Sequence, residues 1–548
     1  MQIIIPMTGI GKRFLDAGYT DPKPLIKVDG QPIIKYVIDL FPGENNITFI
    51  CNSKHLEETN MRNVLNELAP QGKIVSIPPH KLGPVYAVTQ ISDMISDDDE
   101  VIVNYCDFSK YWNYQDFLTH TRKRNAEGAI SAYKGFHPHM LGTTNYAFIR
   151  DHQQWMIEIQ EKKPFTENRM NEYASDGTYY FRNGRLVKKY FNELIEKKID
   201  INGEYYVSMV FNLLVNDGLK VSIYEIQHMF QWGTPRDLEE YQNWSNYFSA
   251  ITLPHPNIDP QDKSINLIPL AGRGSRFLQE GYTQPKPLIP INGKPMIVQA
   301  ANYLPKSKYH TFVCLKEHLD NFPLEEEIKL AFPNALIIRV DQVTEGQAYT
   351  CQLGLNDADL DAPLLIGACD NGMLWDSDQY YELISDPSVD AIVWSFRHHP
   401  SSERNPHMYG WLEVDEQNNV KRVSVKKQIS DDPYNDFAIV GTFYFRKVKF
   451  YLEGYHAMIK KNIRVNNEFY VDSLINELIE QGRSVKNFEV QHYVGWGTPN
   501  DLRTYEYWQS FFHKCSWHPY ALEKDITINP SVISELNQKY HEFKQAHQ

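Results

Sequence analysis

A long internal repeat is the feature that most constrains the fold of this chain. Residues 6–25 and 269–288 are identical at 13 of 20 positions, at an offset of 263 residues. Further along the chain the offset becomes 264, where WGTPRDL from Trp232 matches WGTPNDL from Trp496. Solenoid repeats have periods of about 20–50 residues, so this period is far too long for a solenoid. Each copy is therefore expected to be a complete domain.

Two copies of this size fill almost the whole chain of 548 residues, which is longer than a single hydrophobic core normally supports. We expect the first copy over residues 1–250 and the second over residues 265–514. Residues 251–264 between them are rich in proline and polar side chains, as is typical of a linker. Residues 515–548 have no counterpart in the first copy, and their apolar spacing predicts a helical C-terminal tail.

Charge and cysteine content exclude several classes of protein. The chain carries 69 acidic and 55 basic side chains, a net charge of −14, which argues against a nucleic-acid binder. No apolar run approaches the roughly 20 residues needed to span a bilayer, and the N-terminus lacks the basic region of a secretory signal. The six cysteines form no CxxC motif, so structural zinc and a disulfide scaffold are not expected. We expect a cytoplasmic protein without membrane insertion.

Short apolar segments alternate with helical patterns in each copy, which predicts an α/β fold of two tandem, Rossmann-like, doubly wound domains with parallel sheets. The expected strands of the first copy are residues 2–6, 47–51, 73–77 and 100–105, then residues near 128–134, 145–150 and 176–182. The expected helices are residues 31–40, 54–69 and 84–95, then residues near 184–197, 207–216 and 235–248. Such sheets bind ligands at the carboxyl ends of their strands, so we expect a site after strands 2–6 and 100–105.

The loop after the first strand reads Met7-Thr8-Gly9-Ile10-Gly11-Lys12-Arg13. Glycine permits a close backbone approach and a positive φ. Consecutive N–H groups can form an anion site, and arginine is a planar donor suited to phosphate oxygens. The spacing differs from both the Walker loop and the GxGxxG fingerprint. A tight turn with a surface arginine is the alternative for this loop taken alone.

Two further features occur in both copies. Pro22-Lys23-Pro24 places a lysine between two residues of fixed φ, which would hold its ammonium group at a set position. Asp107 directly follows a predicted strand, where a carboxylate can hold Mg²⁺. A solvated lysine and a helix-capping aspartate are the alternatives. Lys286 and Asp370 repeat both features although the residues around Asp370 have changed, and this favours the functional interpretation.

In combination, these motifs resemble the nucleotidyltransferases of the sugar-1-phosphate type. The family signature is a Gly-rich loop ending in Arg-(Phe/Leu), then Pro-Lys-(Pro/Ala)-Leu, then (Lys/Arg/Gln)-Pro-(Ile/Met)-Ile. This chain has GIGKRF, PKPL and QPII, and again GRGSRF, PKPL and KPMI. The resemblance spans nearly all of each copy and is closest to the branch of capsule and surface-polysaccharide loci, which includes enzymes resembling CTP:phosphoglutamine cytidylyltransferase. It implies domains of the nucleotide-diphospho-sugar transferase type.

The resemblance implies a role for each matching residue. The nucleotide would be bound by Met7, Thr8, Gly9, Gly11 and Gly83, and in the second copy by Leu270, Ala271, Gly272, Gly274 and Gly346. Gly83 would lie against the base. The catalytic residues would be Arg13 and Lys23, with Arg276 and Lys286 in the second copy, and the metal ligands would be Asp107 and Asp370. The acceptor would be bound by Glu161, Lys162, Gly177 and Glu204, with Gly441 and Glu468 in the second copy.

Two positions depart from the family pattern. Many members carry a second metal-binding aspartate two residues before the Gly-Thr of the late motif, where this chain has Gln231 and Gly495. The two-carboxylate metal site of those members is therefore incomplete here. The second copy has Val425-Lys426 where the first has Glu161-Lys162, which indicates that the two copies can differ in their acceptors.

The expected activity is Mg²⁺-dependent nucleotidyl transfer, with Mn²⁺ as the alternative metal. A phosphate oxygen of a small phosphorylated acceptor would attack the α-phosphorus of an NTP, and pyrophosphate would leave. This reaction needs positioning and positive charge rather than a nucleophile–base pair. The product would be a precursor of capsule or surface polysaccharide, and CTP is slightly favoured as the donor.

Three alternatives stay open at this point. Both copies are active, on the same or different acceptors, or one copy only binds nucleotide and regulates the other. A metal-dependent glycosyltransferase is the third, although Asp97-Asp98-Asp99-Glu100 precedes its strand and is therefore not a DxD motif. The sequence does not disclose the base, the acceptor or whether the chain forms a homo-oligomer.

Overall fold

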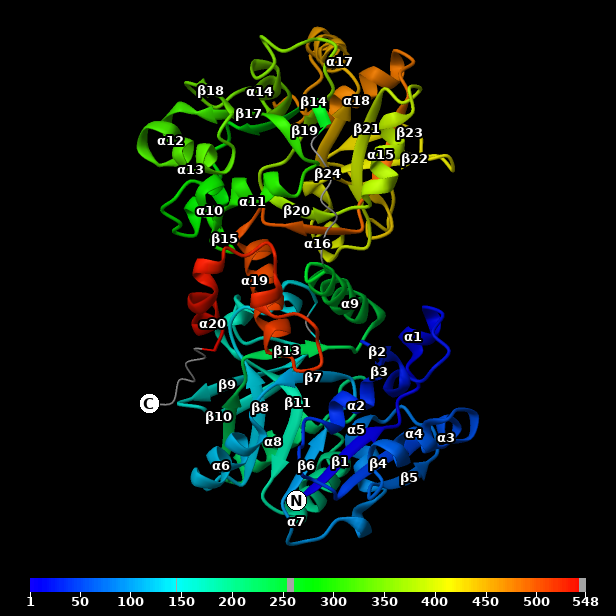
Figure 1. Ribbon diagram of the computed structural model, residues 1–548. Helices are drawn as coiled ribbons and strands as arrows, with labels where there is room; N and C mark the ends of the chain where they lie inside the picture. Colours follow the sequence, from blue (N-terminus) through cyan, green and yellow to red (C-terminus); the bar gives the residue numbers. More distant parts are fainter. Residues whose placement is uncertain (144, 254–260, 542–548) are drawn as a thin grey trace. The chain divides into compact units, whose positions relative to one another are not determined.

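The computed structural model describes residues 1–143, 145–253 and 261–541, and these divide into two compact units. Unit 1 comprises Met1–Ser245 and Lys514–His518, and unit 2 comprises Asn246–His513 and Pro519–His541. Each unit is built on a mixed sheet of nine strands flanked by helices (Figure 1). The predicted fold class, two tandem Rossmann-like α/β domains, is confirmed.

The main sheet of unit 1 has the strand order β5-β4-β1-β6-β11-β8-β12-β10-β9. The strands of unit 1 are β1 (Gln2–Met7), β2 (Lys27–Val28), β3 (Gln31–Pro32), β4 (Ile47–Asn52), β5 (Lys73–Ile77), β6 (Val101–Asn104), β7 (Phe108–Tyr111), β8 (Gly128–Tyr133), β9 (Ala147–His152), β10 (Trp155–Glu161), β11 (Tyr173–Phe181), β12 (Val221–Glu225) and β13 (His228–Gln231). β1, β4, β5 and β6 are parallel, as the sequence predicts. β11 runs antiparallel to β6 and β8, so the prediction of a parallel sheet is wrong for the later part. The reason is that β9, β10 and β11 follow one another without crossover helices, and short connections join antiparallel strands.

The helices of unit 1 agree with most of the predicted ones. They are α1 (Lys12–Asp16), α2 (Ile33–Ile38), α3 (Ser53–Glu58), α4 (Met61–Leu68), α5 (Gly83–Thr89), α6 (Tyr114–Lys123), α7 (Gly184–Glu196), α8 (Val207–Asn216) and the start of α9 (Pro235–Ala250). The single helix expected over 54–69 is two helices, because the backbone is extended at Thr59 (φ −133°), whose hydroxyl accepts a hydrogen bond from the N–H of Met61 (3.2 Å). The helix expected over 84–95 ends at Thr89 and is followed by a short 3₁₀ turn.

Unit 2 repeats this arrangement, with a main sheet in the order β18-β17-β14-β19-β24-β21-β25 and a β22–β23 hairpin paired to β24. Its strands are β14 (Gln261–Leu270), β15 (Pro290–Ile291), β16 (Lys294–Pro295), β17 (Ser307–Leu315), β18 (Leu336–Val340), β19 (Leu364–Ile366), β20 (Asn371–Leu374), β21 (Ala391–Phe396), β22 (Gly410–Val414), β23 (Val420–Val425), β24 (Phe437–Phe445), β25 (Val485–Glu489) and β26 (His492–Gly495). Its helices are α10 (Ser275–Gln279), α11 (Met296–Asn302), α12 (Lys316–Asn321), α13 (Leu324–Ala331), α14 (Gln347–Leu353), α15 (Ser377–Ser385), α16 (Pro400–Arg404), α17 (Val448–Lys461), α18 (Val471–Glu480), α19 (Pro499–Lys514) and α20 (Ile533–His541). β14, β19 and β24 occupy the places of β1, β6 and β11, so the sequence repeat is also a structural repeat.

The segments predicted as linker and tail are described only in part. β14 begins at Gln261, so the last four residues of the expected linker 251–264 belong to a strand, while 254–260 lie outside the described residues. In the predicted tail 515–548, α20 ends at His541, and 542–548 lie outside the described residues. Part of this tail packs on the body of unit 2, where Lys294 donates a hydrogen bond to the carbonyl of Thr527 (2.8 Å).

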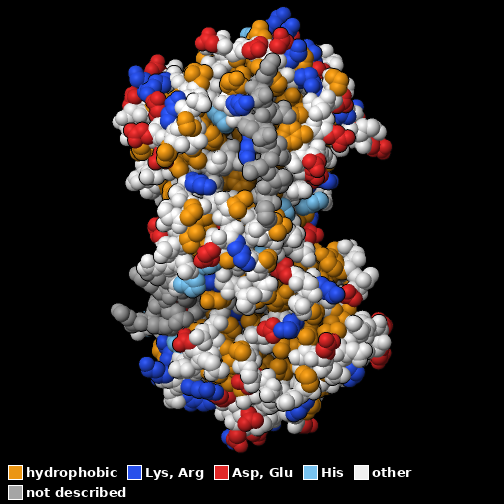
Figure 2. Space-filling view, in the orientation of Figure 1, with side chains coloured by type: hydrophobic (Ala, Val, Ile, Leu, Met, Phe, Trp, Pro, Cys, Tyr) orange, Lys and Arg blue, Asp and Glu red, His pale blue; other side chains and the backbone are white. Residues whose placement is uncertain are grey.

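The surface carries mixed charge, and the thiols lie inside. On the face drawn in Figure 2, basic and acidic side chains are interspersed over the surface. All six cysteines are free, and each is buried or half-buried. Among the described residues, no helix is both long enough and apolar enough to cross a membrane.

A completely buried ion pair distinguishes the core of unit 1 from that of unit 2. The Nζ of Lys110 donates to Asp176 (2.8 Å), Thr178 (2.7 Å) and Ser131 (3.0 Å), and both charged side chains are 0% exposed. Burial outweighs the attraction of Asp176 and lowers the pKa of Lys110 to about 8. In unit 2 the repeat places buried Met373 and Val440 at these two positions.

This difference predicts the outcome of a double-mutant cycle on unit 1. Lys110→Met leaves Asp176 buried without its cation, so we expect a loss of about 3–5 kcal/mol in the free energy of unfolding. Lys110→Met/Asp176→Val copies the pair of unit 2 and should recover at least half of that loss. Urea unfolding of the full chain, followed at the transition that Lys110→Met shifts, measures both values. A double variant as unstable as the sum of the two single variants would contradict this account.

Candidate active site

A cavity of about 280 Å³ opens in unit 1 beyond the carboxyl ends of β1 and β6, where the sequence predicts the ligand site. The predicted site residues that line it are Arg13, Lys23, Asp107, Glu161, Lys162 and Gly177. Tyr146, Asp176 and Asp237 also line it and were not predicted as site residues. The fold thus brings the predicted phosphate-binding cations and the predicted acceptor-binding pair into one cavity.

The Gly-rich loop has the open backbone that a close-fitting ligand requires. Gly11 precedes α1 with φ 70°, and Gly274 precedes α10 with φ 63°, a region that side chains other than glycine disfavour. A Cβ atom added to Gly9, Gly11 or Gly272 would meet nothing within 4 Å, so protein packing does not explain these glycines. The flanking residues Met7, Thr8, Leu270 and Ala271 are buried and lie outside the residues that line the cavity.

Lys23 and Asp107 form an ion pair in the cavity, with Nζ 2.8 Å from Oδ2. The lysine starts a 3₁₀ turn (Lys23–Leu25) after Pro22, whose φ is −55°, so its backbone is as restricted as the sequence predicts. Burial alone would lower the pKa of Lys23, but the attraction of Asp107 outweighs it and raises the pKa above its ordinary value. The carbonyl of Asp107 accepts a hydrogen bond from the N–H of Trp232 (2.7 Å), which holds the end of β6 against the late motif.

Unit 2 builds the same pair at the same place. Lys286 donates to Asp370, and the carbonyl of Asp370 accepts from the N–H of Trp496 (2.8 Å). Burial is again outweighed by Asp370, so the pKa of Lys286 is raised, while Arg276 lowers it from nearby. A Cβ on Gly274 would lie 2.7 Å from the Cβ of Lys286, so this glycine lets the loop approach the lysine.

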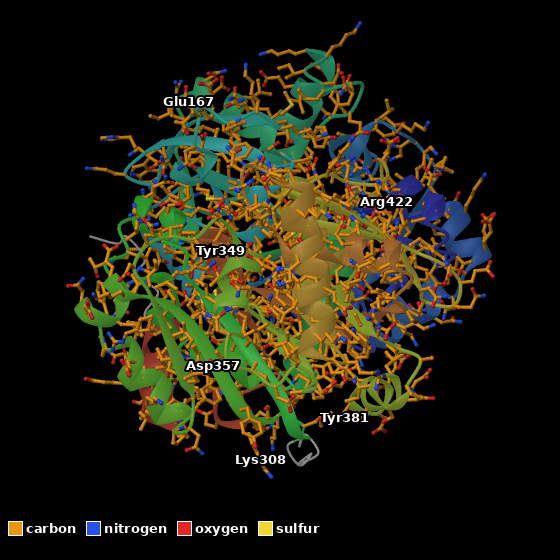
Figure 3. The ribbon with its side chains drawn as sticks, turned by 90° about the horizontal axis from the view of Figure 1, so that it is seen from above. Glu167, Lys308, Tyr349, Asp357, Tyr381 and Arg422 are labelled. Carbon is orange, nitrogen blue, oxygen red and sulfur yellow. The ribbon has the colours of Figure 1, made fainter. Side chains whose placement is uncertain are left out.

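The acceptor side of the cavity in unit 1 is a chain of hydrogen bonds. Lys162 donates to the hydroxyl of Tyr206 (3.0 Å), and that hydroxyl donates to Glu204. Glu161 accepts from Ser208 on α8, and burial raises its pKa above the ordinary value. Glu167, labelled in Figure 3, follows in the next loop at an exposed position and is a matched control for Glu161.

Gly177 and Gly83 are both required by close packing. Gly177 has φ 103°, and a Cβ there would lie 2.9 Å from the ring of Phe108. Gly83 has φ 83°, and its Cβ would lie 2.7 Å from the carbonyl oxygen of Tyr205. Gly346 stands in the same relation to the backbone of Phe469, at 2.5 Å. These approaches explain Gly83 and Gly346 without a ligand, and a role at the base stays a prediction.

Asp237, like Asp176, is an acidic residue of the cavity that the sequence did not predict as a site residue. It forms a reciprocal cap with Thr234, accepting from its hydroxyl (2.7 Å) and its N–H (2.9 Å), and it also accepts from Gln231. Gly233 lies between the two acids and leaves the space between them open. A Cβ at this position would lie 3.4 Å from Asp107 and 3.8 Å from Asp237. Thr-x-x-Asp is the sequence signal of such a cap, and it recurs as Thr498 and Asp501.

The burial of Asp237 predicts a pH dependence of stability. Burial raises the pKa of Asp237 to about 6 from a model-peptide value near 4. The folded chain therefore binds more protons at this group than the unfolded chain between about pH 4 and pH 6, so this contribution to stability is present at low pH and is lost as the pH rises through 6. Asp237→Asn should remove that loss. Unfolding midpoints of both chains at pH 4, 5, 6 and 7 test this, and parallel curves would contradict it.

The residues around Asp107 fit a magnesium ion that keeps several ligands from water or phosphate. Asp107 supplies hard oxygen donors at the cavity wall, and Gly233 leaves the space beside it open toward Asp237. Among the described residues, no group of three or more His, Cys, Asp and Glu side chains is placed to hold a metal ion. The fit is therefore to a metal bound jointly by one or two carboxylates and a substrate.

Part of the chain, including several of these residues, matches a known protein family. Residues 2–212 match the nucleotidyl transferase family. The matched segment contains the Gly-rich loop, Lys23, Asp107 and the acceptor pair Glu161-Lys162. The coarse resemblance inferred from the sequence motifs is confirmed for this segment, whereas the capsule-locus branch is not distinguished.

Curated relatives match at low identity. The bifunctional protein GlmU of Staphylococcus epidermidis is 24% identical over 226 residues, which is 40% of this chain and 47% of the relative. GlmU of Thermosipho africanus is 24% identical over 219 residues, 39% of this chain and 44% of the relative. The chain thus spans about half the length of the curated relatives it matches.

Each of the following solved structures covers a part of this chain about as long as one unit. The nucleoside-diphosphate-sugar pyrophosphorylase from Vibrio cholerae RC9 has 21% identity and a TM-score of 0.36, covering 44% of this chain and 98% of its own. The inositol-1-phosphate CTP transferase from T. maritima has 14% identity and a TM-score of 0.36, covering 47% of this chain and 100% of its own.

Proposed function

We propose that each unit transfers a nucleotidyl group from an NTP to a small phosphorylated acceptor and releases pyrophosphate. The observation that carries this proposal is the repeated pairing of a proline-held lysine with a strand-end aspartate beside the Gly-rich loop, at Lys23–Asp107 and Lys286–Asp370. The family match of residues 2–212 supports the assignment for unit 1. For unit 2, the support is the structural repeat of the same groups.

The chemistry follows from the groups in the cavity. A phosphate oxygen of the acceptor forms a bond to the α-phosphorus, and the bond from the α-phosphorus to the bridging oxygen breaks, so that pyrophosphate leaves with the electron pair. Arg13 and Lys23 place positive charge where the triphosphate gains negative charge, and removing one such donor typically costs about 10²–10³ in rate. Lys162 also lines the cavity and would hold the acceptor phosphate.

Magnesium is the proposed cofactor, with manganese as the alternative. Asp107 and Asp370 would hold it, and the ion would neutralise charge on the leaving phosphates. We also propose the sugar-1-phosphate class, or another small phosphate, as acceptor, CTP as the favoured donor, and synthesis of capsule or surface-polysaccharide precursors as the role. These finer assignments rest on the resemblance of the signature motifs.

A matrix of substrates tests the proposed function. The full chain is incubated with each of four NTPs against phosphorylated sugars, polyols and amino-acid phosphates, with Mg²⁺ or Mn²⁺, and pyrophosphate is measured. We expect release that depends on both an NTP and an acceptor. Consumption of a nucleotide-sugar without pyrophosphate would instead support a glycosyltransferase, and no acceptor-dependent reaction for any pair would contradict the proposal.

A further inference from the structure

Unit 2 lacks a glutamate at the position of Glu161, yet a carboxylate stands at a neighbouring position. Val425 of unit 2 occupies the position of Glu161, and Asp472 occupies the position of Ser208. In unit 1 these two side chains, Glu161 and Ser208, are hydrogen-bonded to each other. The acidic side chain of this pair of positions therefore stands on the strand in unit 1 and on the facing helix in unit 2.

The backbone around the two positions is equivalent in both units. The N–H of Lys162 donates to the carbonyl of Tyr146 (2.7 Å), and the N–H of Lys426 donates to the carbonyl of Tyr409 (3.0 Å). Both lysines have the same left-handed backbone, with φ 58° and 60°. The residues that follow β10 and β23 are therefore held by equivalent backbone positions, at the same register, in the two units.

The helix that carries Ser208 or Asp472 is docked in the same way in both units. Asn212 on α8 makes two hydrogen bonds to the backbone of Ile159 on β10, at 2.8 and 3.0 Å. Asn476 on α18 makes the same two bonds to Val423 on β23, at 2.8 and 2.9 Å. Residues four apart share one face of a helix, so position 208 or 472 faces the strand position two residues further on.

A third substitution makes room for the relocated carboxylate. β22 of unit 2 has Gly410 where β9 of unit 1 has Ala147, and each pairs with the strand position in question, Val425 or Glu161. A Cβ on Gly410 would lie 3.0 Å from Oδ2 of Asp472, closer than such contacts normally come. The three positions read Ala147-Glu161-Ser208 in unit 1 and Gly410-Val425-Asp472 in unit 2. The glycine leaves the space that the aspartate fills, so these substitutions fit one another.

Asp472 lies in the first turn of α18, against Gly410 of β22, and interacts electrostatically with Lys426. It is buried, and among the described residues no group donates a hydrogen bond to it. Burial raises its pKa to about 6, and Lys426 opposes this shift. Burial lowers the pKa of Lys426, Asp472 opposes this shift, and Arg276 adds to it.

We propose that Asp472 is the acceptor-binding carboxylate of unit 2 and that the exchange of its position with Val425 sets a different acceptor from that of unit 1. The acceptor is a small phosphomonoester that offers an O–H or N–H donor to Asp472 and carries fewer hydroxyl groups than a sugar phosphate. Around the site, unit 2 has Ile439 and Phe443 where unit 1 has Ser175 and Tyr179, so it offers fewer polar partners to a polyhydroxylated sugar. This inference rests on the proposed nucleotidyl transfer.

The test uses the full chain with unit 1 silenced by Lys23→Met and Lys162→Ala. In this background, glucose 1-phosphate, glycerol 3-phosphate and phosphoethanolamine are compared as acceptors, the last two separating a hydroxyl donor from an ammonium donor. We expect a lower KM for glycerol 3-phosphate or phosphoethanolamine than for glucose 1-phosphate. Asp472→Ser should raise the KM of the preferred acceptor about 10- to 100-fold and leave the KM of the NTP unchanged.

Two further variants serve as a negative control and as a test of transferred specificity. Glu480→Ser, at an exposed carboxylate on the same helix α18, should leave both KM values unchanged. Gly410→Ala/Val425→Glu/Asp472→Ser transplants the arrangement of unit 1 and should move the preference toward glucose 1-phosphate. An acceptor KM that Asp472→Ser does not change would overturn the inference while the proposed function stands.

Calorimetry covers the case in which no turnover is found. If no NTP and acceptor pair reacts in this background, the proposed function fails for unit 2, and the three acceptors are titrated into the same background chain with and without Asp472→Ser. Weaker binding of an acceptor to the Asp472→Ser chain would still support an acceptor site at Asp472. Binding of none of the three to the background chain, or equal binding to both chains, would overturn it.

Discussion

Lys23→Met/Lys286→Met is expected to lower acceptor-dependent pyrophosphate release by about 10²–10³-fold relative to the unmodified chain. In each unit this lysine is the half-buried cation that is paired with the strand-end aspartate. Methionine keeps most of the side-chain volume but removes the charge that, in the proposed function, stabilises the transferring phosphoryl group. The KM of the acceptor should change much less than kcat, because the acceptor phosphate is assigned to Lys162 and Lys426.

The matched control is Lys197→Met/Lys447→Met, which removes two exposed lysines that pair with Glu193 and Asp361 on the surface. Surface pairs of this kind contribute at most about 1 kcal/mol, so activity and unfolding midpoint should stay close to those of the unmodified chain. If the control pair lowered the rate as much as the Lys23 and Lys286 pair, charge at the cavity would not be the cause. A rate unchanged by the Lys23 and Lys286 pair would remove these residues from catalysis.

Asp107→Asn and Asp370→Asn are expected to distinguish the activity of unit 1 from that of unit 2. Each single variant should abolish transfer to the acceptor used by its own unit, by about 10²-fold or more, and leave transfer by the other unit in place. The double variant should lose both. Asparagine keeps the shape and a hydrogen-bond acceptor for the adjacent lysine but lacks the charge that a divalent cation needs.

The same pair of variants decides between two active units and one active unit with a regulatory partner. If Asp370→Asn leaves every reaction unchanged in rate but alters its dependence on nucleotide concentration, unit 2 regulates rather than transfers. If each single variant leaves the total rate unchanged for every donor and acceptor, neither aspartate has the proposed role. Rates should be compared at saturating Mg²⁺, so that a weakened metal affinity is separated from a lost catalytic step.

Much of the fold could be predicted from the sequence because its signals are local or repeated. The continuous apolar runs of β1, β4 and β6 belong to buried parallel strands, and the strand-end position of Asp107 places it at the ligand edge of the sheet. The nearness of Lys23 and Asp107 was implied only through the family resemblance. Their 2.8 Å contact joins positions 84 residues apart, and no local pattern specifies it.

The residues that escaped prediction depend on packing between distant elements. Asp237 reads in sequence as a helix cap, which it is, and its place at the cavity wall comes from the position of α9 relative to β6. The exchange between Val425 and Asp472 joins a strand to a helix 47 residues further along, so comparison of the two repeats one position at a time shows only the loss of a glutamate. The antiparallel course of β11 was missed for the same reason, because strand direction follows from the connections.

The central claim is that a new bond joins the α-phosphorus of an NTP to the acceptor phosphate, and ³¹P NMR of the products tests it most directly. With the NTP and acceptor that give the highest pyrophosphate release, we predict equal amounts of pyrophosphate and of a product with two coupled diphosphate resonances. Lys23→Met/Lys286→Met should abolish both signals together. Inorganic phosphate with a nucleoside diphosphate, or pyrophosphate with free nucleoside monophosphate, would contradict the account.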